Sequence, residues 1–200
     1  MSFLTGKKVV VMGVANKRSI AWGCAQALKA QGAEVIYTYQ NDRMKKPLER
    51  LLESDEFVVE CDVANDESIA SAFETIKEYA GEIHGVVHAV AYANKEDLSG
   101  DILNISRDGY ALAQDISSYS LIAVTKYAKP ILAENAGIVT LSYLGAERAV
   151  PNYNMMGIAK AALESSVRYL AAELSPQKIR VNAISACLLY TSPSPRDRGW

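Results

Sequence analysis

Short runs of apolar residues alternate along the chain with longer segments in which apolar residues recur at helical spacing. The short runs are five to seven residues long and rich in valine, isoleucine and tyrosine, which is typical of β-strands. They predict strands over residues 8–12, 34–39, 57–61, 85–91, 137–142 and 180–185. Because these runs are almost continuously apolar, we expect strands that are buried on both faces of a parallel sheet.

The segments between the predicted strands have the pattern of helices. The first helix is predicted from Ser19 to Ala30 by four apolar residues at helical spacing: Ile20, Cys24, Ala27 and Leu28. Further helices are predicted over residues 42–53, 66–79, 107–132 and 157–174. Alternating strands and helices favour an α/β fold, and right-handed crossovers make it a Rossmann-type, doubly wound parallel sheet flanked by helices.

Composition and charge narrow the range of partners. Half of the 200 residues are hydrophobic, 22% are charged, and the net charge is −2 with both signs spread along the chain. No basic block indicates nucleic-acid binding, no apolar run is long enough to cross a membrane, and residues 1–8 lack the apolar core of a signal peptide. We therefore expect a cytoplasmic protein that binds neither nucleic acid nor membranes.

The spacing of the cysteines and histidines does not indicate a metal site. Cys24, Cys61 and Cys187 lie far apart without a CxxC pair, so we expect reduced, buried thiols rather than disulfides. His84 and His88 flank the fourth predicted strand, and we interpret them as packing or strand-end residues. We expect no bound metal.

The loop after the first predicted strand has features of a phosphate-binding turn. Gly13 permits a tight turn, and Gly23 would let the following helix lie close to the sheet. Ser19 can cap the helix and bond a phosphate oxygen, and free N–H groups at Ser19 and Ile20 suit a pyrophosphate. The loop is longer than the usual GxGxxG, and since many such turns bind nothing, it is weak evidence when taken alone.

Polar residues at the ends of the next two predicted strands extend this candidate cofactor site. Gln40 stands where dinucleotide enzymes usually have an acid for the ribose hydroxyls. Asp62 and the backbone of Val63 could bond an adenine amino group, although Asp62 could instead cap a helix. We predict NADH as cofactor, with NADPH left open because the basic residues within 43–46 either attract a 2′-phosphate or are merely solvated.

The strongest catalytic candidates follow the fifth predicted strand. Tyr153 and Lys160 are seven residues apart, so they share a helix face if the helix begins near Tyr153. An ammonium beside a phenol favours the phenolate, strengthens the phenol as a hydrogen-bond donor, and can hold ribose hydroxyls. Tyr143 precedes the pair, directly after the strand. A tyrosine and a lysine at this spacing also occur together by chance. The pair is the best catalytic candidate because it follows the fifth strand of a predicted dinucleotide-binding fold.

Three stretches of the sequence resemble one family in particular. They are residues 13–23, residues 115–120 (DISSYS), and residues 140–154 together with Lys160, and residues 180–186 also fit. The chain resembles the NADH-type enoyl-acyl-carrier-protein reductases of bacterial type II fatty acid synthesis, a divergent branch of the short-chain dehydrogenase/reductase superfamily. Ordinary members of that superfamily carry the lysine four residues after the tyrosine, where this chain has Gly157.

The resemblance implies a role for each candidate residue. The implied catalytic residues are Tyr143, Tyr153 and Lys160. The implied cofactor contacts are Gly13, Ser19, Ile20, Gln40, Asp62, Val63, Val90 and Lys160. The implied substrate contacts are Ala93, Tyr143 and Tyr153, with the loop 92–101 as one wall of the acyl site.

The resemblance also implies a reaction and an assembly. Hydride passes from NADH, or NADPH, to an enoyl thioester on acyl carrier protein, Tyr153 stabilises the enolate, and Lys160 adds positive potential. Full-length relatives are implied to be homotetramers. Residues 1–186 form the implied domain, and where the family continues with Gly-Pro-Ile this chain has Cys187-Leu-Leu. We therefore expect a C-terminally incomplete, inactive chain, with 187–200 a non-native, unstructured tail.

Two other functions stay open. One is a different reductase of the same superfamily that acts on a ketone or alcohol, which Tyr143 and the position of Lys160 argue against. The other is a non-catalytic dinucleotide-binding fragment, which the intact Tyr153 and Lys160 argue against.

Overall fold

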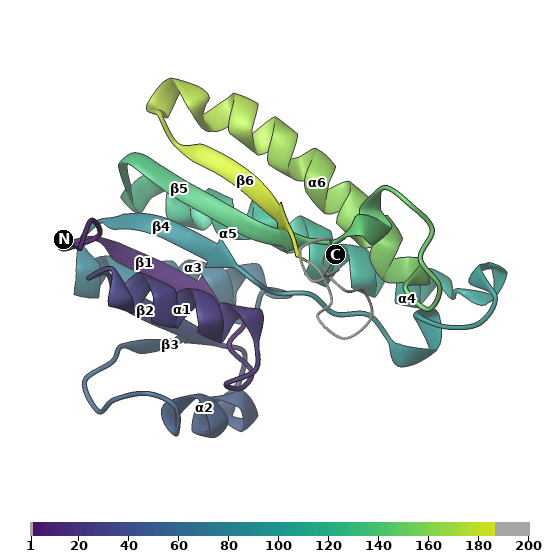
Figure 1. Cartoon of the computed structure of the whole chain (residues 1–200), viewed down its shortest axis with the longest axis horizontal. Coiled ribbons are helices and arrows are strands. Elements are labelled where there is room, and N and C mark those ends of the chain that lie inside the picture. Colours follow the sequence, from purple (N-terminus) through teal and green to yellow (C-terminus); the bar gives the residue numbers. More distant parts are fainter. Residues whose placement is uncertain (1, 187–200) are drawn as a thin grey trace, which may run out of the picture.

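The fold is built on one sheet of six parallel strands, and the structure, a computed structural model, describes residues 2–186. The strands are β1 (Lys8–Met12), β2 (Glu34–Tyr39), β3 (Val58–Glu60), β4 (Ile83–His88), β5 (Leu132–Ser142) and β6 (Arg180–Ser185). They lie in the order β3-β2-β1-β4-β5-β6, so the chain winds outward in one direction from β1 and in the other from β4 (Figure 1). This order confirms the predicted doubly wound, Rossmann-type sheet.

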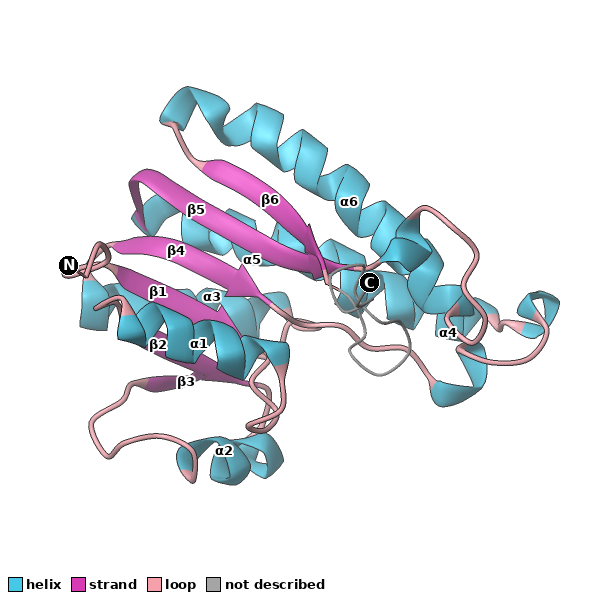
Figure 2. Cartoon of the chain, viewed as in Figure 1, coloured by secondary structure: helices cyan, strands magenta, loops and turns pink. Residues whose placement is uncertain are grey.

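Helices cover both faces of the sheet (Figure 2). They are α1 (Ile20–Ala30), α2 (Asp42–Glu49), α3 (Asp66–Ala80), α4 (Arg107–Gln114), α5 (Ser120–Ala128) and α6 (Asn154–Leu174). One apolar core joins α1 and α2 to the first face and includes Val9 and Val11. A second core joins α3, α5 and α6 to the opposite face and includes Val10. Neighbouring residues of β1 therefore enter different cores, which explains the continuously apolar strand pattern.

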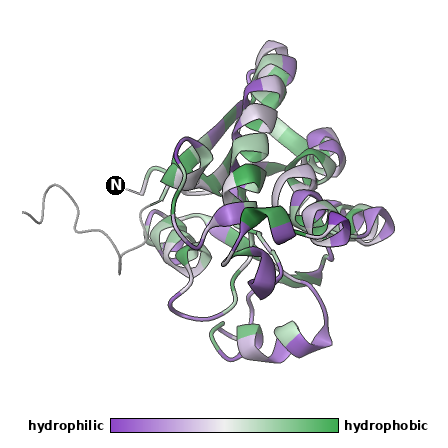
Figure 3. Ribbon diagram, turned by 90° about the vertical axis from the view of Figure 1, so that its right-hand side faces the viewer, coloured by the Kyte–Doolittle hydropathy of each residue, from purple (hydrophilic) through white to green (hydrophobic). Residues whose placement is uncertain are grey.

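Hydrophobic residues are concentrated around the sheet, as Figure 3 shows, with hydrophilic residues along the outer loops and helices. Within residues 2–186, no helix is long and apolar enough to cross a membrane, and no group of three or more His, Cys, Asp or Glu residues is placed to hold a metal ion. Cys24 and Cys61 are free thiols. Cys187 and the predicted tail lie outside the described residues, so the tail and the domain boundary at 186 stay predictions.

The prediction of a single helix over residues 107–132 is confirmed for residues 107–128 and wrong at its C-terminal end. Residues 107–128 are continuously helical, as α4, a π-helical turn over Asp115–Tyr119, and α5, and a short 3-10 turn over Lys129–Ile131 follows. Pro130 lacks the N–H that would continue the helix, and β5 begins at Leu132 rather than at residue 137. Leu132 pairs with Ile83 of β4, and the register between the two strands shifts before the regular pairing begins at Gly137.

Several other boundaries differ from the prediction by a few residues. β3 is shorter than predicted, β4 begins and ends earlier than 85–91, and α2 ends at Glu49 rather than at residue 53. Helix α6 begins at Asn154 with Tyr153 in the N-cap position, three residues earlier than predicted. This early start meets the condition under which Tyr153 and Lys160 share one helix face.

The buried face of helix α1 is shifted from the one that its sequence predicts. Cys24 and Leu28 of the predicted face pack against the core, but Ala21 and Ala25 are its fully buried residues, whereas Ile20 is 50% exposed. A Cβ at Gly23 would have no atom within 4 Å, so the predicted role of Gly23 in close packing is wrong. The small side chains of the two alanines provide that close contact instead.

Candidate active site

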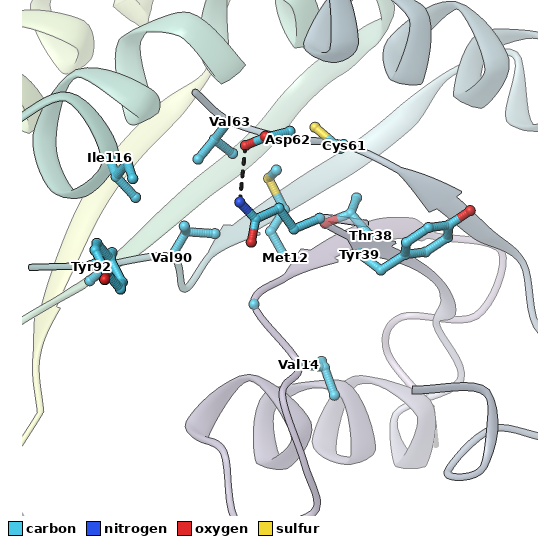
Figure 4. A pocket seen from close by; sticks show the side chains of 13 residues that line it. Met12, Val14, Thr38, Tyr39, Cys61, Asp62, Val63, Val90, Tyr92 and Ile116 are labelled. Carbon is cyan, nitrogen blue, oxygen red and sulfur yellow. Dashed lines mark hydrogen bonds between the residues drawn. The ribbon is translucent and has the colours of Figure 1, made fainter. Parts of the chain in front are cut away.

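A cavity of about 280 Å³ opens at the carboxyl ends of β1, β2, β3 and β4 (Figure 4). The connections that follow β1 and β4 run in opposite directions, which is where doubly wound folds bind ligands. Five residues predicted as cofactor contacts line this cavity: Gly13, Gln40, Asp62, Val63 and Val90. The structure thus brings together residues that are up to 77 positions apart in the sequence.

Gly13 lies at the tightest point of the cavity wall. Its φ angle is +93°, and a Cβ at this position would lie 2.1 Å from the carbonyl oxygen of Ala89. Only glycine meets both conditions without strain. Gly13 therefore lets the loop after β1 approach the loop after β4.

Gln40 and Asp62 contact each other across the mouth of the cavity. The Gln40 amide Nε2 donates to Asp62 Oδ1 at 3.4 Å, and the same oxygen accepts from the backbone N–H of Ala64 at 3.1 Å. The N-cap of α3 is Asn65, whose side chain accepts from the first turn. The alternative in which Asp62 caps the helix is therefore wrong, and Asp62 lines the cavity instead.

Ser19 and Ile20 stand at the start of α1, away from the lining of this first cavity. The Ser19 hydroxyl accepts from the N–H of Trp22 at 3.2 Å and donates to the carbonyl of Asn16 at 2.7 Å. The N–H of Ser19 also bonds the Asn16 carbonyl, so the prediction that this group is free is wrong. The N–H of Ile20, at the first helical position, lacks an acceptor within the helix.

A second cavity, of about 300 Å³, contains the predicted catalytic residues. Tyr143, Tyr153 and Lys160 line it together with Ile20. Ala91 lines both cavities, so the two are neighbours. An extended ligand with one end in each cavity would pass the N-terminus of α1.

The two tyrosines of the second cavity contact each other edge to face. Their ring centroids are 4.8 Å apart, and the ring planes meet at 70°. Burial, and then the charge of Tyr143, raises the pKa of Tyr153 to about 12. A Cβ at Gly145 would lie 2.4 Å from the Tyr153 ring, so the absence of a side chain there makes room for the phenol.

Lys160 is buried beneath the tyrosines, and its ammonium contacts the backbone. Nζ donates to the carbonyl of Leu141 at 2.7 Å, and only 7% of the residue is exposed. Burial lowers the pKa of Lys160 to about 8. The predicted lowering of the Tyr153 pKa by the ammonium is wrong for this structure, because the influences on that phenol all raise its pKa.

The loop 92–101 contributes Leu98 to the lining of the second cavity, but two of its other residues lie elsewhere than the predicted acyl site. Ala93 lines neither cavity and packs, with Tyr153, against a small apolar cluster that includes Met155. Tyr92 lines the first cavity rather than an acyl wall.

The sequence prediction also misses lining residues of the first cavity. Thr38, Tyr39 and Cys61 line it because they end β2 or follow β3, so their positions in the predicted strands are a signal that would have found them. Ile116 carries no such signal, because it reaches the cavity from the π-helical turn.

Comparison with known proteins gives a consistent result. The model of the family described as enoyl-(acyl carrier protein) reductase matches residues 13–196. The chain is 67% identical over 189 residues to the NADH enoyl-[acyl-carrier-protein] reductase FabI of Enterococcus faecalis, which covers 94% of this chain and 76% of that protein. It is 54% identical over 187 residues to the corresponding NADH enzyme of Bacillus subtilis, with 92% and 72% covered.

A solved structure extends the similarity to the fold. The Bacillus cereus enoyl-acyl carrier protein reductase, in complex with NADP+ and indole naphthyridinone, superimposes with a TM-score of 0.89. It is 49% identical, and the match covers 98% of this chain and 79% of that one. From the family match, the relatives and the shared fold, we conclude that this chain belongs to the enoyl-(acyl carrier protein) reductase family.

Proposed function

We propose that the protein is an oxidoreductase that reduces the trans-2 double bond of an enoyl thioester, carried by acyl carrier protein, in type II fatty acid synthesis. The observation that carries the proposal is the pair of adjoining cavities. One joins Gly13, Gln40 and Asp62 at the switch point of the sheet, and the other joins the predicted catalytic residues. A dinucleotide site beside a phenol donor is what reduction by a nicotinamide cofactor requires.

The residues of the first cavity fit the adenosine half of NADH. The Gln40 amide and the Asp62 carboxylate offer donors and acceptors for ribose hydroxyls and the adenine amino group. Gly13 lets the loops after β1 and β4 approach each other and so shapes the wall of this cavity. The N–H of Ile20 would hold the pyrophosphate, and Ser19 would join it once its hydroxyl releases the carbonyl of Asn16. Val63 and Val90 would contact the adenosine. NADH is the cofactor named for the Enterococcus faecalis relative, while the Bacillus cereus structure contains NADP+.

The second cavity would stabilise the charge that develops on the substrate. NADH, when bound, supplies the hydride that adds to the β-carbon of the enoyl thioester. With its pKa raised to about 12, Tyr153 stays protonated at neutral pH and can donate a hydrogen bond to the thioester oxygen as the enolate forms. Lys160 adds positive potential and has protons left for ribose hydroxyls after bonding Leu141. Tyr143 would border the substrate beside Tyr153, whereas contact with Ala93 would require the loop to move.

The decisive experiment is an assay of NADH oxidation with a short trans-2-enoyl thioester, run in parallel with NADPH and with a 3-keto thioester. The assay compares this chain with one extended by the C-terminal part of the Enterococcus faecalis relative, so it also tests the sequence-based expectation of an inactive chain. We expect turnover of the enoyl substrate by the extended chain, and there we expect Tyr153→Phe to lower kcat roughly a hundredfold with little change in NADH affinity, since one aimed donor contributes about 3 kcal/mol. Tyr169→Phe, at an exposed position of α6, is the matched control. Reduction of only the 3-keto thioester would favour a ketone reductase, and NADH binding without any turnover would favour a non-catalytic fragment.

We also propose that the protein assembles as a homotetramer in the cytoplasm, without nucleic acid or membrane as a partner. Three large apolar residues along α4, the π-helical turn and α5 support the assembly: Tyr110, Tyr119 and Ile122 are 45%, 47% and 40% exposed. The net charge of −2, with no basic block, supports the absence of nucleic acid. Light scattering after size-exclusion chromatography tests the assembly, and cell fractionation tests the location.

A further inference from the structure

His88 is a fully buried polar residue beside the cofactor cavity. It is the last residue of β4, so it lies two residues before Val90 and four before Tyr92, which both line the cavity. Its Nδ1 lies 3.0 Å from the hydroxyl of Thr140 in β5, and its Nε2 lies 2.8 Å from the hydroxyl of Ser120 in α5. The imidazole thus links two strands of the sheet to the helix layer.

The two hydroxyl partners of His88 compete for the one proton of its neutral ring. The Ser120 hydroxyl donates its only proton to the carbonyl of Ile116, at 2.7 Å, and the Thr140 hydroxyl donates its own to the carbonyl of His88, at 3.0 Å. A neutral ring can donate to only one of these hydroxyls, but in either tautomer Nε2 lies within hydrogen-bond distance of Ser120. Burial, and then the charge of Lys160, lowers the pKa of His88 to about 4, which keeps the ring neutral at physiological pH.

The chain of hydrogen bonds from His88 ends on the π-helical turn over Asp115–Tyr119. In an α-helix, the carbonyl of Ile116 would accept from the backbone N–H of Ser120, but here that N–H bonds the carbonyl of Asp115. The Ser120 hydroxyl donates to that Ile116 carbonyl instead, at 2.7 Å. The contact with His88 Nε2 therefore fixes the position of the hydroxyl that bonds the carbonyl of Ile116 in the π turn.

The π turn in turn shapes the cavity wall. The side chain of Ile116 lines the cavity near Val90 and Tyr92 (Figure 4). The hydroxyl of Ser117 accepts from the N–H of Tyr92 and donates to the carbonyl of Tyr92, both at 2.8 Å. The π-helical turn thus places the Ile116 side chain in the cavity wall and also holds the backbone of Tyr92, a second wall residue.

We propose that His88 is a positioning residue for the cofactor site, which acts through Ser120 to hold the π turn in the shape that places Ile116 and Tyr92 at the cavity. The inference rests on the proposed function only in that NADH is taken as the ligand of the cavity. A histidine that merely stabilises the sheet would affect global stability, but it would not affect NADH affinity or the local exchange of the π turn.

The test measures NADH affinity and amide hydrogen exchange for His88→Leu, Ser120→Ala and the double variant, with the full chain in each case. Ser120→Ala is the milder change and keeps the test valid if His88→Leu folds poorly. His88→Gln keeps a donor toward Ser120 and serves as the conservative rescue. His84→Leu is the matched control, because His84 lies at the opposite end of the same strand, where it accepts from the backbone N–H of Lys8 and lies 3.8 Å from the Glu82 carboxylate.

We expect each single variant to weaken NADH binding about fivefold, the equivalent of one lost hydrogen bond, and the double variant to be no weaker than the worse single one. Exchange should quicken at Tyr92 and residues 116–121, while His88→Gln and His84→Leu bind NADH as the unmodified protein does. Normal NADH affinity in Ser120→Ala and His88→Leu would overturn this inference and leave the proposed function intact. Amide exchange that quickens evenly over the whole sheet would do the same. Failure of the unmodified protein to bind NADH would instead overturn the proposed function and the cofactor part of the inference with it.

Discussion

At the scale of single residues, Lys160 carries a charge that its surroundings disfavour. Because burial lowers its pKa from 10.5 to about 8, the ammonium that would hold the ribose is lost as the pH rises through about 8. We therefore expect NADH affinity to fall between pH 7 and pH 9, and Lys160→Met to bind weakly with no dependence on pH in that range. Titrations at several pH values measure this. Lys178→Met removes an exposed lysine and should leave the profile unchanged, and an unmodified protein with a flat profile would contradict the prediction.

Gly13 is the second residue whose surroundings allow a sharp prediction. Gly13→Ala should cost more than about 2 kcal/mol of unfolding free energy, because the new Cβ would be 2.1 Å from the carbonyl oxygen of Ala89 and the φ angle is +93°. It should also abolish NADH binding. Gly6 lies in a turn closed by the N–H of Lys7 and the carbonyl of Leu4, has a φ angle of +77° and has nothing within 4 Å of a Cβ, so Gly6→Ala should show only the conformational cost of roughly 1 kcal/mol. Urea unfolding compares the two variants, and equal losses would mean that the steric contact is unimportant.

At the scale of elements, the packing of α6 against the turn over Leu144–Ala146 explains the position of the lysine. A Cβ at Gly157 would lie 2.7 Å from the carbonyl oxygen of Gly145, so no side chain fits four residues after Tyr153. Lys160, seven residues after Tyr153, reaches the cavity from the same helix face. The unusual spacing in the sequence therefore has a steric cause in the structure.

This packing predicts the outcome of moving the lysine. Gly157→Lys combined with Lys160→Ala should give no turnover of an enoyl thioester, and Gly157→Ala alone should lower kcat at least about tenfold by pushing the turn toward Tyr153. Ala172→Ser, at an exposed position of α6, is the control that should keep full activity. Steady-state kinetics and thermal melting measure both effects. Full activity in Gly157→Ala would show that the turn can move without disturbing Tyr153.

At the scale of the whole molecule, the buried neutral ring of His88 links folding stability to pH. The pKa is 6.5 when the histidine is exposed and about 4 in the folded protein, so the unfolded state takes up the proton first as the pH falls. The stabilising contribution is complete above pH 6.5 and is lost toward pH 4, on the order of 3 kcal/mol in all. Urea unfolding at several pH values should therefore show a steeper loss of stability for the unmodified protein than for His88→Leu. Parallel curves would mean that His88 does not provide this linkage.

Elements whose causes are local follow from the sequence alone. The strands over 34–39 and 180–185 match the prediction residue for residue. The first is a buried run of β-branched and aromatic residues, and in the second polar residues alternate with Val181, Ala183 and Ile184, so each carries a local strand pattern. The helix cap at Ser19 was also predictable, because the serine hydroxyl needs only the backbone N–H three residues later as its partner. Gln40 and Asp62 were predictable as neighbours because the carboxyl ends of parallel strands meet at one edge of the sheet.

Other features were decided by contacts between segments that are distant in the sequence. β5 begins at Leu132 because Leu132 pairs with Ile83 of β4, a contact that the local sequence pattern does not indicate. The helix over 107–128 contains a π turn whose Ile116 carbonyl bonds the Ser120 hydroxyl, and that hydroxyl contacts a histidine 28 residues away from Ile116. Lys160 donates to the Leu141 carbonyl rather than to a phenol, because in the folded chain that carbonyl oxygen lies 2.7 Å from its buried Nζ. The pattern of apolar and polar residues thus determined which segments form strands and helices and where the site lies. Only the tertiary structure decided which polar atoms bond each other there, because hydrogen-bond partners depend on distances that a one-dimensional pattern does not contain.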